Sequence, residues 1–152
     1  MEKQQAQNKC MQLCSSREYC AFDISEKLNK WEVAKNHSEE IITYLIDNKF
    51  INNERYARAY VNDKIKFNHW GKNKLKYYLK HKGIDGEIIT NSFNDFSKEE
   101  YIDIATTEIQ KKLQKTKAKD AFELKSKVAK SIINKGFESD LVFKILNVML
   151  QE

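Results

Sequence analysis

The chain has 152 residues, of which 41% are hydrophobic and 32% charged. That length suits one ordinary domain or a short array of small units, and the composition excludes wholesale disorder. There is no proline and there are only four glycines, which argues against β-sandwiches and barrels because their turns need these residues. The net charge of +5 and the pI near 9.0 predict an anionic partner, either nucleic acid or an acidic protein surface.

The first fifty residues predict three helices. Residues 3–14 and 17–30 form the first two, and Ser38 is expected to begin a third. The apolar stripe of this third helix consists of Ile42, Leu45 and Ile46.

The three cysteines, Cys10, Cys14 and Cys20, align with apolar helical stripes and have no C-x-x-C spacing. We therefore expect buried structural thiols rather than a metal site. No run approaches the ~20 apolar residues of a membrane helix. The start of the chain also lacks the apolar core of a signal peptide, so we expect neither membrane insertion nor export.

The densest basic charge lies within residues 51–84, where lysines alternate with aromatic side chains. Asn53 is expected to cap one helix that runs to about Phe67. A second helix follows Gly71 and ends at His81. Gly83 suits the left-handed position that ends such a helix, and Asp85 is placed to cap the next.

Tyr77 lies opposite the apolar stripe of that second helix, which consists of Leu75, Tyr78 and Leu79. Lys74, Lys80 and His81 are its neighbours on the outer face. This pattern favours a contact site for phosphates and bases or for an acidic protein groove. The alternative is a solvated lysine face that carries one exposed tyrosine.

Three more helices are expected after residue 96. Ser97 and Glu100 form a capping box, and Asp120 caps the next helix. Residues 111–119 are predicted to be a basic connector between these two, and Glu138 is expected to begin the last helix. The apolar stripes are Ile102, Ala105, Ile109 and Leu113; Leu124, Val128 and Ile132; and Val142, Ile145, Leu146 and Met149.

Lysine-containing helix ends recur at Leu28–Trp31, Leu79–Gly83 and Ile133–Gly136, each followed by a short helix. Because self-similarity at a period of about fifty residues is typical of a repeat array, we predict an all-α fold of three tandem three-helix units with helix-turn-helix character. The predicted boundaries are residues 1–50, 51–96 and 97–152.

The segments INNERYARAYV, WGKNKLKYYLKHKGI and IINKGFESDLVFKIL resemble the RecX family of bacterial regulators of the RecA recombinase. The matching motif positions are Asn52, Asn53, Arg55, Tyr56, Ala57, Trp70, Gly71, Gly83, Gly136 and Phe137. Asn52 and Asn53 replace the paired aspartates of the family, so two negative charges are lost. A glycine turn that normally follows the early KL segment is also absent, which leaves the packing of the first unit open.

The resemblance implies tandem three-helix units in an elongated, curved body in the cytoplasm. It also implies a negative regulator that lies along the groove of the RecA–DNA filament, blocks its extension or promotes its disassembly, and so inhibits ATP hydrolysis, strand exchange and co-protease activity. Such a protein acts in DNA repair, homologous recombination and the SOS response. We expect a monomer without a cofactor, with single- or double-stranded DNA as a further partner. The expected filament or DNA contacts are Arg17, Arg55, Arg58, Lys66, Lys72, Lys74, Lys76, Tyr77, Lys80 and Lys82.

A second hypothesis is a DNA-binding protein of helix-turn-helix type, because residues 75–93 contain a helix, a glycine turn and a capped helix. The presumed recognition helix, GEIITNSFND, has no lysine or arginine to reach phosphates or guanine edges. Neither reading involves an enzyme, since no P-loop, Rossmann glycine pattern, HExxH motif or nucleophile–base arrangement is present.

Overall fold

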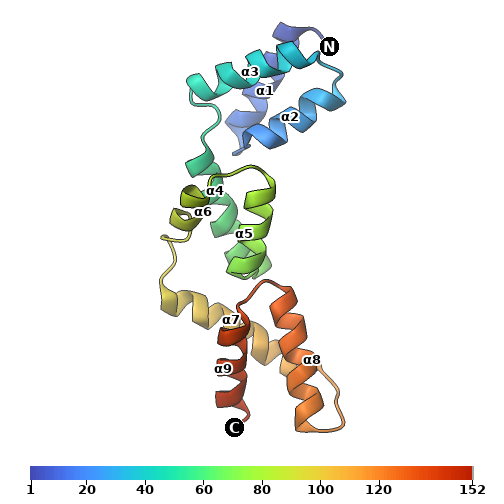
Figure 1. The fold of residues 1–152 in the computed structure, drawn as a ribbon, viewed down its shortest axis with the longest axis vertical. Helices are drawn as coiled ribbons and strands as arrows, with labels where there is room; N and C mark the ends of the chain where they lie inside the picture. The colour runs from blue at the N-terminus through green and yellow to red at the C-terminus, as the bar shows by residue number, and fades with distance from the viewer. Residues whose placement is uncertain (152) are drawn as a thin grey trace. The chain divides into compact units, whose positions relative to one another are not determined.

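The computed structural model describes residues 1–151, and within them the protein is entirely helical (Figure 1). The predicted all-α class is confirmed. The elements are α1 (Lys3–Ser16), α2 (Ala21–Lys30), α3 (Lys35–Asp47), α4 (Asn53–Asp63), the π-helical turn η1 (Lys64–Asn68), α5 (Lys72–His81), α6 (Gly86–Asn91), α7 (Lys98–Lys115), α8 (Ala121–Asn134) and α9 (Ser139–Met149). None of the helices in this part of the chain is long and apolar enough to span a bilayer.

The chain packs into two compact units. Unit 1 comprises Met1–Tyr60 and Leu79–Ser92, and unit 2 comprises Val61–Tyr78 together with the chain from Phe93 onward. In unit 1, α1, α2 and α3 enclose a core of Ala6, Cys10, Tyr19, Ile24, Leu28, Val33, Ile41, Leu45 and Ile51. In unit 2, α7, α8 and α9 enclose a core of Tyr101, Ala105, Ile109, Val128, Ala129, Ile132, Phe137, Val142 and Leu146. The predicted boundaries of three units at residues 50 and 96 stay a prediction.

The same left-handed turn follows α2, α5 and α8. It is formed by Glu32 with φ 56°, Gly83 with φ 76° and Gly136 with φ 104°. The N–H of Val33 donates to the carbonyl of Leu28 at 3.0 Å, and the N–H of Ile84 bonds to Leu79 in the same way at 3.1 Å. The turn after α2 therefore keeps this geometry without a glycine, because Glu32 adopts the left-handed conformation in its place.

Two glycines allow segments far apart in the sequence to cross inside unit 2. The N–H of Gly71 donates to the carbonyl of Lys135 at 2.8 Å, and the N–H of Asn73 donates to the carbonyl of Gly136 at 2.9 Å. A Cβ atom on Gly71 would lie 2.2 Å from the carbonyl carbon of Gly136. Only glycine fits here, so this contact ties the start of α5 to the turn after α8.

The predicted starts of three helices differ from the observed starts or caps. Asn52, not Asn53, caps α4, because its side-chain oxygen accepts from the N–H of Arg55 at 3.0 Å. Helix α3 begins at Lys35, which leaves Ser38 buried inside it. The carboxylate of Glu138 accepts from the hydroxyl of Tyr101 and makes no side-chain cap for α9. The predicted caps at Ser97, Asp85 and Asp120 are confirmed.

Other corrections concern helix bounds and burial. The second helix begins at Ala21 rather than Arg17, and residues 111–115 of the predicted connector are the last turn of α7. Ile46 and Tyr78 were expected in apolar stripes but are 48% and 37% exposed. The ring of Tyr78 stacks on the ring of Trp70 instead of packing into the core, so part of it remains exposed.

Candidate partner-binding surfaces

A row of three aromatic rings lies on unit 2 where η1 leads into α5. The ring of Trp70 stacks on Tyr78, with centroids 5.5 Å apart and an interplanar angle of 26°. Tyr77 meets Tyr78 edge to face at 5.4 Å and 81°. The ammonium groups of Lys64 and Lys74 lie 4.9 and 4.2 Å from the Trp70 centroid. We call these five residues the aromatic–lysine face.

Local backbone geometry explains why the row forms. The chain leaves η1 through His69, which has a left-handed φ of 55°, and this bend places Trp70 just before α5. Lys74 and Tyr78 follow at positions i+4 and i+8, so they lie above it on one side of the helix. That spacing is visible in the sequence and would have revealed the row, which the helical-stripe analysis missed by assigning Tyr78 to the core.

The aromatic–lysine face is open to solvent. Tyr77 is 67% exposed, and Phe67 on the preceding π-helical turn is 77% exposed. Lys66 lies beside it, with its ammonium 5.9 Å from the Phe96 ring. Exposed rings interleaved with cations can stack on flat groups and attract anions, which suits nucleobases with phosphates or an acidic protein surface.

The other lysines expected on this helix contact different rings of unit 2. The ammonium of Lys72 lies 4.5 Å from the centroid of Tyr101, while its backbone N–H donates to the Tyr101 hydroxyl at 2.9 Å. The ammonium of Lys76 lies 5.9 Å from the Phe93 ring. Burial and the bond to Glu138 raise the pKa of Tyr101, so its hydroxyl stays protonated and can donate to that carboxylate.

The remaining predicted contacts belong to unit 1, and Arg55 has the most intramolecular partners. Its guanidinium bonds to Glu18 at 2.7 Å and donates to the carbonyls of Lys49 and Phe50 at 3.1 and 3.3 Å. The bond to Glu18 raises the pKa of Arg55. Arg55 therefore ties the α3–α4 connection to the end of α1, and most of its donors are occupied within the chain.

Four further cations among the predicted contacts also belong to unit 1. The guanidinium of Arg17 lies 4.3 Å from the Tyr19 ring. Lys82 pairs with Asp23 at 2.6 Å, with both side chains mostly buried. Arg58 and Lys80 are exposed on α4 and α5. The predicted contact residues thus divide between the two units, and Arg55 and Lys82 are engaged in ion pairs within the chain.

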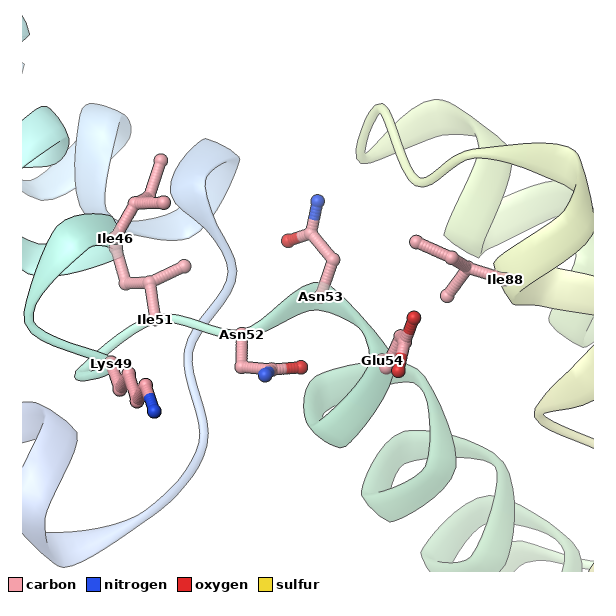
Figure 2. Close-up of a pocket in the computed structure, with 7 residues that line it drawn as sticks. All are labelled: Ile46, Lys49, Ile51, Asn52, Asn53, Glu54 and Ile88. Atoms are coloured by element: carbon pink, nitrogen blue, oxygen red, sulfur yellow. The ribbon is translucent and has the colours of Figure 1, made fainter.

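The motif residues that begin α4 line a pocket of about 340 Å³ in unit 1. Its walls are Ile46, Lys49, Ile51, Asn52, Asn53, Glu54 and Ile88, and Figure 2 shows the Asn53 amide projecting from the start of α4 between Ile46 and Ile88. The side-chain oxygen of Asn53 is buried and has no hydrogen-bond partner among the residues described. The other motif side chains are structural: Tyr56 and Ala57 are core residues.

No group of three histidine, cysteine or carboxylate side chains that could hold a metal ion occurs in residues 1–151. Cys10 and Cys20 are buried and Cys14 is half-buried, and all three are free thiols. The expectation of structural thiols is confirmed for the two buried ones.

Consecutive three-helix domains that present basic and aromatic side chains define a class of helical-repeat proteins suited to binding a larger partner. Comparison with known proteins shows which family within this class the chain belongs to. A family model described as the second three-helix domain of RecX matches residues 52–92, and one described as the third matches residues 99–146. The chain belongs to the RecX family.

Relatives and solved structures agree. A protein named Regulatory protein RecX from Bacillus cytotoxicus is 30% identical over 130 residues, which are 86% of this chain and 48% of that protein. One of the same name from Clostridioides difficile is 27% identical over 145 residues, which are 95% of this chain and 68% of the relative. The chain thus spans about half the length of the Bacillus relative.

The crystal structure of RecX from Lactobacillus salivarius superposes with a TM-score of 0.81 at 22% identity, covering 99% of this chain and 97% of that one. A crystal structure of regulatory protein RecX gives a TM-score of 0.84 at 22% identity, covering 94% of this chain and 70% of the other. These likenesses confirm the fold of helical repeats.

Proposed function

We propose that this protein is a negative regulator of the RecA recombinase in the bacterial cytoplasm, acting in DNA repair, homologous recombination and the SOS response. It binds as a monomer along the groove of the RecA–DNA filament and blocks extension or promotes disassembly. ATP hydrolysis, strand exchange and co-protease activity fall as a result. The observation that carries the proposal is the aromatic–lysine face in a chain built from RecX domains.

The proposed contact combines charge and stacking. The ammonium groups of Lys64 and Lys74 supply attraction to phosphates or carboxylates, and the exposed faces of Tyr77 and Tyr78 supply flat contact area. Each such contact is weak alone. Several contacts along one filament bind tightly only while neighbouring protomers keep a matching spacing, which explains how a small regulator can respond to an assembled filament in preference to single subunits.

Direct, sequence-specific DNA binding is less well supported. The presumed recognition helix α6 has only six residues, and Ile89 in its middle is buried. Its sequence, GEIITN, offers no lysine or arginine. Lysine and arginine are the side chains that commonly reach phosphates and guanine edges from a recognition helix.

The test is DNA-dependent ATP hydrolysis by RecA of the same organism, with this protein at substoichiometric amounts and single-stranded DNA in excess. We expect a progressive fall in rate, because the regulator acts on filaments rather than by competing for DNA. An unchanged rate, together with normal retention of naked DNA, would replace the proposal with the helix-turn-helix reading.

A further inference from the structure

Unit 2 carries an apolar groove of about 450 Å³ along α7 and α9, apart from the aromatic–lysine face. Its lining residues follow helical spacing: Lys98, Ile102 and Thr106 on α7, and Asp140, Leu141, Lys144, Ile145, Val148 and Met149 on α9. Leu141, Ile145 and Met149 are partly buried against the core. Val148, in contrast, is 74% exposed, so the groove has an aliphatic wall that the chain itself does not cover.

The corresponding positions of unit 1 carry an exposed ion pair. Lys3 precedes the buried Ala6 of α1 by three residues, just as Ile102 precedes the buried Ala105 of α7. Glu40 follows the left-handed Glu32 by eight residues, as Lys144 follows the left-handed Gly136. Lys3 and Glu40 form a salt bridge, whereas Ile102 and Lys144 cannot. The repeat therefore has a charged pair at these positions in one copy and an open apolar groove in the other.

We infer that this groove binds an amphipathic helix of a partner protein, with aliphatic residues on one face and carboxylates beside them. A groove between two packed helices, with anchors spaced by three and four residues, is the geometry that accepts such a helix. Lys98 and Lys144 outnumber Asp140 at its edge, and the whole chain carries a net charge of +5. The charge of the lining residues and the charge of the whole chain both favour an acidic segment.

A second copy of this chain is a poorer occupant. In a two-fold symmetric contact the same patch appears on both sides, so two linings that each carry two lysines and one aspartate would meet, and both are net positive. Like charges brought together across an interface oppose binding. The inference is independent of the proposed action on RecA, which rests on the aromatic–lysine face.

The test uses the isotope-labelled full chain and three synthetic peptides of about 15 residues, which is about four helical turns. The first peptide has leucines at positions i, i+4 and i+7 with glutamates beside them. The second replaces these glutamates by lysines, and the third replaces the leucines by serines. We expect amide shift changes confined to residues 98–106 and 140–149 with the first peptide, about tenfold weaker binding of the second, and none of the third.

Two variants check the location. Val148→Glu removes part of the aliphatic wall and repels the carboxylates of the glutamate peptide, so it should weaken binding of that peptide at least tenfold. Phe122→Glu is the matched control, because Phe122 is also on unit 2 and 79% exposed but lies outside the groove. Equal binding of the glutamate and lysine peptides, or shifts elsewhere in the chain, would overturn the inference. So would a dimer in sedimentation that Val148→Glu disperses, because the occupant would then be a second copy.

Discussion

The turn after α2 runs through Glu32 in the left-handed region, whereas glycine occupies the equivalent positions after α5 and α8. An L-residue in that conformation brings its Cβ too close to a backbone oxygen. Glu32 is exposed, so its side chain offers little packing in return. The turn after α2 therefore contains a locally strained residue, whereas the equivalent turns after α5 and α8 avoid this strain by using glycine.

Replacing Glu32 by glycine should raise the free energy of unfolding by about 1 kcal/mol, since it removes this backbone strain. Urea unfolding at neutral pH measures the change. The reciprocal control is Gly83→Ala, in which the added Cβ meets no atom within 4 Å and only the φ of 76° opposes it. If Gly83→Ala stabilised the protein or Glu32→Gly weakened it, the equivalence of the two turns would be refuted.

The crossing of Gly71 and Gly136 predicts a much larger effect. Gly71→Ala forces a Cβ into the backbone of Gly136 at 2.2 Å, so it should destabilise unit 2 by about 3 kcal/mol or more. Gly86→Ala is the matched control, because nothing lies within 4 Å of its added Cβ and its φ is ordinary. Thermal unfolding of the two variants should differ clearly. Equal stability would mean that the two segments do not cross so closely.

The buried thiol of Cys10 makes stability depend on pH in the alkaline range. Burial, helped by the neighbouring Cys14, raises the pKa of Cys10 from 9.0 to about 11. Between these values the folded chain holds a proton that the unfolded chain releases, so the free energy of unfolding should fall as pH rises from about 9 toward about 11. Urea unfolding across this range measures the slope. Cys10→Ala should reduce it, and an unchanged slope in that variant would assign the dependence to other groups.

At the scale of elements, the aromatic–lysine face depends on η1, on the bend at His69 and on the start of α5. Stacking of Trp70 on Tyr78 holds both rings in place, so the site is ordered before any partner arrives. Such preorganisation reduces the conformational entropy that is lost when a partner binds.

Charge reversal of Lys74 together with Lys76 should weaken RecA inhibition at least tenfold while leaving helix content unchanged. Lys74 loses its position over Trp70, and two attractive charges become repulsive. The ATPase assay and far-ultraviolet circular dichroism measure the two effects. The control reverses Lys127 together with Lys130, two exposed lysines of α8 in the same unit, and so changes the net charge equally. Equal loss of inhibition in the control would show that net charge alone matters and would remove the site assignment.

The extent to which the sequence predicts this structure differs between helices and surfaces. Apolar periodicity locates the buried Leu75 and Leu79, and capping residues such as Ser97 and Asp120 mark helix starts correctly, because both signals are local. Periodicity wrongly assigns Tyr78 to the core because the competing ring, Trp70, lies beyond a helix break. The groove of α7 and α9 could not be predicted, since it depends on which side of two packed helices remains uncovered.

For the whole molecule, membership of the RecX family and the likeness to solved RecX structures establish the repeat architecture. The proposed action on RecA rests instead on the aromatic–lysine face. Two surfaces of unit 2, the aromatic–lysine face and the groove between α7 and α9, are the sites through which we propose that this chain engages partners.

Filament length gives the most direct test of the central claim. RecA of the same organism is assembled on long single-stranded DNA with ATP, and electron microscopy records filament lengths with and without this protein at substoichiometric amounts. The account predicts filaments that are markedly shorter with the wild-type chain and restored in length with the Lys74 and Lys76 reversal. Filaments of unchanged length with the wild-type chain would contradict regulation of the filament.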